Sequence, residues 1–158
     1  MQEYISSIEL CKTLATELKN DDLFRSLAEE NYDKGWTIEI GFDRLRQDWK
    51  KVSPFVVLLP QSEEAGSDGF TTYSIGALLG VVDNSIDNQD ISLLQGLDFL
   101  SNKAFPQAFS VISKASDSLP TMSFTNYDCE FEQEGFPLVY CNIALTFTMR
   151  TAIGTRRW

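Results

Sequence analysis

Histidine is absent from this chain of 158 residues, and cysteine occurs only at Cys11, Cys129 and Cys141. Without an imidazole, neither a Ser-His-Asp triad nor a Cys-His pair can form, and zinc sites of the Cys/His type are excluded as well. No two cysteines form a Cys-x-x-Cys motif. We interpret all three as small core residues. A disulfide between Cys129 and Cys141, which the strand pattern described below could place opposite each other, is the alternative.

The chain also lacks the short motifs of nucleotide and hydrolase sites, namely GxxxxGK[ST], GxGxxG after a strand, and GxSxG. No apolar run approaches the ~20 residues that span a bilayer, and residues 1–4 show no secretion signal. We therefore expect a soluble protein of the cytoplasm, and nucleotide and hydrolase functions have no motif to support them.

Basic residues are missing from one long stretch. No Lys or Arg occurs between Val52 and Asn102, and the formal net charge of the chain is −10. Duplex binding depends on neutralising phosphates with Lys and Arg, so the charge argues against a DNA-binding module. Solubility is the simpler explanation of the acidity. The stretch contains seven acids: Glu63, Glu64, Asp68, Asp83, Asp87, Asp90 and Asp98.

The composition, 43% hydrophobic and 23% charged, predicts a single globular domain over residues 1–158. Apolar residues at steps of three and four predict a helical N-terminal segment over residues 3–33, in which Asp21 or Asp22 caps a second helix. The polar, glycine-bearing stretch 61–70 predicts an exposed loop. Strands are predicted at 36–42, 55–59 and 71–82.

Two further features concern the middle of the chain. Gly76 and Gly80 share one face of the 71–82 strand and could admit a bulge or close packing by another chain. Asp90 is predicted to cap a helix. Pro106 is predicted either to kink that helix or to start a second one at its N1 position. The resulting order predicts an α+β fold, a mostly antiparallel sheet with a long C-terminal β-hairpin and helices packed against it.

That β-hairpin, over residues 124–149, has the clearest pattern in the chain. Both arms alternate with period 2, which is typical of half-buried strands. Placing both apolar faces on one side requires Phe131 to pair with an odd-numbered residue, most simply Val139. Gly135 then lies in the turn, where a positive φ costs a glycine little. The apolar face of the second arm comprises Val139, Cys141, Ile143, Leu145, Phe147 and Met149.

Two acidic groups are candidate sites. Asp83, Asp87 and Asp90 could bind a hard cation, but their spacing does not match an EF-hand, and a turn followed by a helix cap is the simpler explanation. Asp128, Glu130 and Glu132 project from one face of a strand, with Glu134 in the turn. This second group is open to three interpretations: a solvated strand face, an assembly surface that lines a lumen or meets a neighbour's arginines, or a paired-carboxylate acid/base site.

The tail of the sequence, residues 151–158, is basic. Together with Arg150 it carries Arg156, Arg157 and Trp158, and Arg and Trp are enriched at interface hot spots. A frayed terminus is the alternative. We therefore take Asp128, Glu130, Glu132, Arg150, Arg156, Arg157 and Trp158 as the candidate oligomer interface.

The order of these elements resembles a known family. The quoted segments are Pro-Phe-Val-Val-Leu-Leu at 54–59, the strand at 72–82, the acidic turn Glu-Gly-Phe-Pro at 134–137, and the closing strand that ends at Arg150. Over residues 3–150 the chain is similar to the tail-completion (tail terminator) and related head–tail joining proteins of long-tailed bacteriophages and prophages.

The resemblance implies a virion structural protein without catalytic residues. Such a protein caps the finished tail tube as a ring, commonly a hexamer, at the head-proximal end of the tail, and it is assembled in the bacterial cytoplasm. The implied partners are other copies of itself, the tail tube protein and the head–tail connector, while DNA only passes through the lumen. An exposed strand edge and an acidic lumen suit that role.

Two other functions stay open on the sequence. A cytoplasmic α+β adaptor or regulatory protein could bind a host partner through the same hairpin, and would stay monomeric at high concentration. A carboxylate–metal enzyme would use one of the two acidic groups, and would show a thermal shift with divalent cations that depends on those acids.

Overall fold

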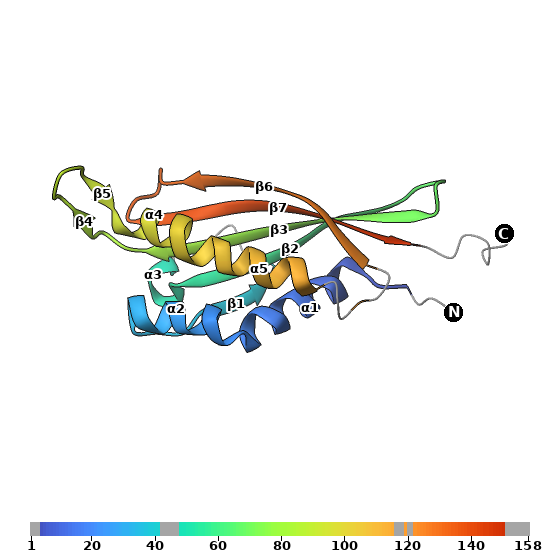
Figure 1. Ribbon diagram of the computed structural model, residues 1–158, viewed down its shortest axis with the longest axis horizontal. Coiled ribbons are helices and arrows are strands. Elements are labelled where there is room, and N and C mark those ends of the chain that lie inside the picture. The colour runs from blue at the N-terminus through green and yellow to red at the C-terminus, as the bar shows by residue number, and fades with distance from the viewer. Residues whose placement is uncertain (1–3, 42–47, 116–118, 120–121, 151–158) are drawn as a thin grey trace.

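The computed structural model describes residues 4–41, 48–115, 119 and 122–150 (Figure 1). It confirms the α+β fold, with 37% helix, 41% strand and a mostly antiparallel sheet that includes the C-terminal hairpin. The main sheet has the order β1-β2-β3-β7-β6, and only the β1–β2 pair is parallel. Its strands are β1 (Thr37–Ile40), β2 (Phe55–Ala65), β3 (Phe70–Val82), β6 (Met122–Glu132) and β7 (Leu138–Arg150).

The two N-terminal helices form where capping residues start them. The Ser6 hydroxyl accepts a hydrogen bond from the Glu9 amide at 3.1 Å and begins α1 (Ser7–Asn20). Asp21 accepts one from the Phe24 amide at 2.8 Å and begins α2 (Asp22–Tyr32). Of the two residues predicted as the cap, Asp21 is therefore the one observed. One stripe of α1 is buried against the sheet: Leu10, Cys11, Leu14 and Leu18.

Both faces of the sheet are covered near the start of β2, as its continuous apolar run predicts. Val56 and Leu58 belong to the main core with α1, α4 and α5, on the side where Figure 1 shows the helices gathered. Phe55 faces the other side, where the ring of Trp49 in α3 (Trp49–Val52) lies 4.7 Å away between centroids. Phe55 to Leu58 are therefore all buried.

The glycines of β3 are packed by this chain itself. A Cβ at Gly80 would lie 2.4 Å from Cζ of Phe55 and 2.9 Å from Cβ of Tyr140, so only glycine fits there. At Gly76 the nearest atom is the amide nitrogen of Gln61, at 2.7 Å. The sequence left open close packing by another chain, but at both positions this chain's own side chains occupy the space.

The predicted bounds of the 61–70 loop are wrong at both ends. β2 continues to Ala65 and β3 begins at Phe70, so only residues 66–69 connect the two strands. A register shift between Pro60 and Ser62 lets the ladder continue, and β7 pairs alongside as far as Phe70↔Arg150. Hydrogen bonding between neighbouring strands thus extends β2 through residues whose polar, glycine-bearing composition disfavours a strand. The resulting arm extends from one end of the molecule (Figure 1).

The C-terminal hairpin has the predicted faces but a different partner for Phe131. Phe131 pairs with Cys141, an odd-numbered residue as expected, rather than with Val139. The reason is that Leu138 and Val139 pair with β3 only. The last β6–β7 pair is Glu132↔Tyr140, and residues 133–139 connect these two residues. The predicted apolar face of β7, Val139 to Met149 at alternate positions, is buried throughout.

Turn and helix details correct two further expectations. Gly135 lies in the turn but has no positive φ; the Phe136–Pro137 peptide there is cis. Asp90 caps no helix, because α4 (Gln95–Phe99) has Leu94 as its N-cap. Before it, β4 (Ile86–Asp87) pairs with β5 (Leu93–Leu94) as a small hairpin.

Pro106 does not start a second helix at its N1 position, and the helix continues through it. A π-helical stretch, η1 (Leu100–Ala104), joins α4 to α5 (Phe105–Ala115), and Pro106 is the second residue of α5. The wider turn before the proline accommodates its missing N–H. No helix among the described residues is long and apolar enough to cross a membrane.

Candidate functional site

The β6 strand forms an open edge of the sheet. Among the described strands it pairs only with β7, so its other edge presents unpaired backbone donors and acceptors. The register shifts between Phe124 and Asn126, which places Thr125 at a bulge, and beyond it the pairing is regular to Glu132. A regular strand edge of this length, from Asn126 to Glu132, is a template for another strand.

The outer face of β6 carries the predicted acidic row. Asp128, Glu130 and Glu132 lie opposite Ala144, Asn142 and Tyr140 of β7, so all three side chains project from one face. Asp128 and Glu130 are exposed and Glu132 is half-buried. The structure therefore brings these three predicted residues together in a row along the edge, as expected from the alternation.

The inner face of β6 leaves aromatic surface uncovered. Tyr127 is 45% exposed and Phe131 40% exposed, although both lie on the side of the core. Helix α5 covers this face incompletely: the rings of Phe105 and Phe109 lie 5.8 and 4.8 Å from that of Tyr127, between centroids. Exposed aromatic rings at an open strand edge are typical of a protein interface.

Arg150 lies away from the acidic row of the same molecule. It ends β7 opposite Phe70, whereas Glu130 pairs with Asn142, eight residues earlier on β7. Arg156, Arg157 and Trp158, the other predicted interface residues, lie outside the described residues. Of the seven candidates, the structure thus groups three and separates Arg150 from them.

Asp83, Asp87 and Asp90 act as turn residues in the structure. Asp83 accepts hydrogen bonds from the Tyr32 hydroxyl and the Ser85 amide, both at 2.8 Å. Asp87 accepts one from the Gln89 amide at 3.2 Å. Within the described ranges, no group of three or more Cys, Asp and Glu residues is placed to hold a metal ion. The geometry therefore favours a role in turns over a cation site for these residues.

The environment of Tyr32 makes its hydroxyl a donor. Burial is the main reason that its pKa is raised well above the ordinary value, and the hydrogen bond to Asp83 adds to the effect. A hollow of about 240 Å³ lies beside this pair, also lined by Asp98 and Lys103. It is smaller than most ligand pockets and offers no nucleophile and base in contact.

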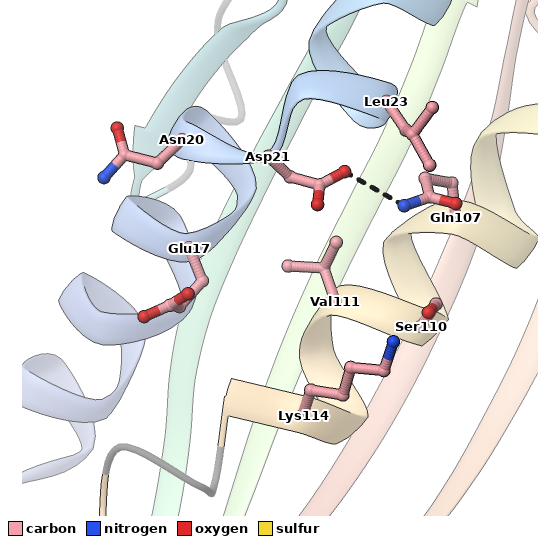
Figure 2. Close-up of a pocket in the computed structure, with 8 residues that line it drawn as sticks. All are labelled: Glu17, Asn20, Asp21, Leu23, Gln107, Ser110, Val111 and Lys114. Atoms are coloured by element: carbon pink, nitrogen blue, oxygen red, sulfur yellow. Dashed lines mark hydrogen bonds between the residues drawn. The ribbon is translucent and has the colours of Figure 1, made fainter.

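A second hollow, of about 340 Å³, lies between the α1–α2 junction and α5 (Figure 2). At its centre the Asp21 carboxylate accepts hydrogen bonds from the Phe24 amide and, at 2.9 Å, from the Gln107 side chain. Asp21 is therefore engaged as a helix cap. The other lining residues supply no acid–base pair and no ligand set. They are Glu17, Asn20, Leu23, Ser110, Val111 and Lys114.

The cysteines are free thiols with little nucleophilic character. Burial raises the pKa of Cys11 to about 11 and raises that of Cys141 further. These two thiols are therefore protonated at neutral pH. Cys129 pairs with Ile143 and Cys141 with Phe131, so the two cysteines are diagonal neighbours rather than directly opposite.

Sequence reasoning missed the aromatic cluster that joins α5 to β6. Phe105 and Phe109 stand four residues apart on one helix face and meet Phe124 and Tyr127. The i, i+4 spacing was visible in the sequence, but which strand it contacts was not. Neither a protein-family model nor a curated protein matches the chain.

Proposed function

We propose that this chain is a non-enzymatic virion protein that assembles into a ring and caps a phage tail tube where the tail joins the head. The resemblance to tail-completion proteins implies six copies in the ring. The observation that carries the proposal is the open β6 edge, which combines free backbone groups, an acidic outer row and exposed aromatic rings. A ring requires an interface between two different surfaces of the same chain, and an open strand edge supplies one of them.

Charge and element order give further support. The outer-face acids Asp128, Glu130 and Glu132 suit a contact with arginines of a neighbouring copy, and the net charge of −10 suits a ring through which DNA passes without binding. The observed α+β fold, with its closing hairpin, agrees with the element order on which the resemblance to tail-completion proteins rests. The tail tube protein and the head–tail connector are the further partners that this role implies.

A second candidate contact surface lies outside the C-terminal hairpin, through which the adaptor hypothesis has the protein bind its partner. The β4–β5 hairpin, which extends from the end of the molecule opposite the β2–β3 arm (Figure 1), exposes three aliphatic side chains. Ile86 is 44% exposed, Ile91 82% and Leu93 39%. Such a surface suits contact with a second protein, whether a host partner or a component of the head–tail joint.

The β6 edge is tested with one substitution and a matched control. Phe131→Asp places a charge at the open edge, and Phe136→Asp places one in the β6–β7 turn. The two rings are similarly exposed, Phe131 at 40% and Phe136 at 43%. We expect Phe131→Asp to raise the concentration for half-assembly at least tenfold in sedimentation velocity, and Phe136→Asp to leave it within twofold. Equal behaviour of the two variants would remove the β6 edge from the interface.

A further inference from the structure

Charge is segregated between the two halves of the C-terminal region. Residues 122–134 contain four acids and no Lys or Arg, whereas residues 135–158 contain three arginines and no acid. The acids Asp128, Glu130 and Glu132 lie along the open edge of β6. The arginines follow from the end of β7 onward, so each half is the electrostatic complement of the other.

The tail of the same molecule falls short of Glu130 and Glu132, the two acids at the far end of the row. Glu130 and Glu132 pair with Asn142 and Tyr140, eight and ten residues back from Arg150 on β7. At ~3.3 Å per residue these two acids are about 26 and 33 Å from the point where the tail leaves the sheet, whereas Asp128, opposite Ala144, is about 20 Å from it. Seven further residues, to Arg157, extend at most ~24 Å, and reversing direction uses at least two of them. A neighbouring copy has no such limit.

Other surfaces of the chain fit the β6 edge less well. Two β6 edges paired with each other would bring the two acidic rows side by side, and like charges on neighbouring strands are destabilising. The β1 edge has only four strand residues, Thr37–Ile40, and includes the acid Glu39. The tail carries a charge opposite to that of the row, and the 135–158 half to which it belongs contains no acid.

The chemistry of both faces of β6 matches the tail. Adjacent residues of a strand point to opposite faces, so Arg156 and Arg157 would project to opposite sides of a strand added at this edge. One arginine then meets the acids Asp128 and Glu130. The other meets the exposed rings of Tyr127 and Phe131, where a guanidinium group stacks favourably on an aromatic face.

We propose that residues 151–158 of one copy add as a strand to the β6 edge of a neighbouring copy. This inference rests on the proposed ring, because it needs a second copy, and it names the two surfaces that meet. The contact is head-to-tail, since each copy gives its tail to one neighbour and receives the tail of another, which is the kind of interface that closes a ring.

The test uses two full-length charge reversals, alone and mixed. Asp128→Arg/Glu130→Arg reverses the row, and Arg156→Glu/Arg157→Glu reverses the tail. We expect each variant alone to assemble at least tenfold more weakly than the wild-type chain in sedimentation velocity. An equimolar mixture should recover assembly to within threefold, because the wild-type tail of the first variant meets the wild-type row of the second, and the two reversed surfaces also match.

A matched control separates this contact from a general charge effect. Lys19→Glu/Lys114→Glu alters two exposed lysines of α1 and α5 with the same change in net charge as the tail variant. We expect this variant to assemble like the wild-type chain, and circular dichroism to show all variants folded. Wild-type assembly that is unaffected by either reversal would overturn the tail contact and leave the ring standing. A wild-type chain that stays monomeric would overturn both.

Discussion

At the scale of single residues, Tyr73 ties α1 to the sheet through one buried hydroxyl. Its side chain is fully buried, and the hydroxyl donates a hydrogen bond to the Ile5 carbonyl at 2.6 Å. Burial is the largest cause that raises the pKa of Tyr73 to about 12, and the nearby Glu63 adds to it. The folded protein therefore favours the protonated hydroxyl, which has a consequence at high pH.

Tyr73→Phe should lower the free energy of unfolding by about 1 kcal/mol at pH 8, the usual net value of one hydrogen bond. Because the folded pKa is raised, this contribution is complete below the unfolded pKa of 10 and is lost as the pH rises towards 12. The difference between wild type and variant should thus nearly close at pH 11, measured by urea unfolding. Tyr127→Phe, which removes a hydroxyl from a half-exposed ring, is the control and should change the free energy of unfolding by less than about 0.5 kcal/mol at pH 8.

Gly80 offers a second prediction at this scale. Gly80→Ala should destabilise the chain by about 1–3 kcal/mol, because its Cβ would collide with the buried Phe55 ring and with Cβ of Tyr140. Gly76→Ala is the matched control on the same strand and face. There the neighbour is the end of the Gln61 side chain, which can move, so we expect a change below about 0.5 kcal/mol. Equal losses in thermal unfolding would contradict the packing described for Gly80.

At the scale of elements, periodicity predicted the helices and most strands because burial imposes it directly. The stripe of α1 and the alternation of β7 match the observed burial. Three features were not predicted, because they depend on contacts with other segments of the chain, which a local sequence pattern does not show. They are the extension of β2 to Ala65, the Phe131↔Cys141 register, and the β4–β5 hairpin in place of a cap at Asp90. Each is set by a neighbouring strand or by the start of a helix elsewhere in the chain.

The contact between α5 and β6 leads to a prediction about the edge strand. The Phe109 ring touches those of Phe105, Phe124 and Tyr127. Phe109→Ala should cost about 2–3 kcal/mol, somewhat less than for a fully buried phenylalanine. It should also speed amide hydrogen exchange in residues 126–131 more than in β3. Phe136→Ala, at an exposed turn position, should change neither; protection of β6 that survives Phe109→Ala would show that α5 does not anchor the edge.

At the scale of the whole molecule, the acidic row was predictable from the sequence, but the edge that carries it was not. Alternation places Asp128, Glu130 and Glu132 on one face, and this grouping is observed. That β6 rather than β7 is the outer strand depends on β7 pairing with β3, a contact between residues some 70 positions apart in sequence. The exposure of Tyr127 and Phe131 follows from that order and from the limited cover by α5.

The ring is the central claim, and one measurement tests it most directly: negative-stain imaging of the largest species from a size-exclusion column with light scattering, run at low and high protein concentration. The account predicts a closed ring with a central hole, whose mass is a whole multiple of 17.9 kDa and whose population falls as salt rises. A monomer at every concentration and salt would contradict it.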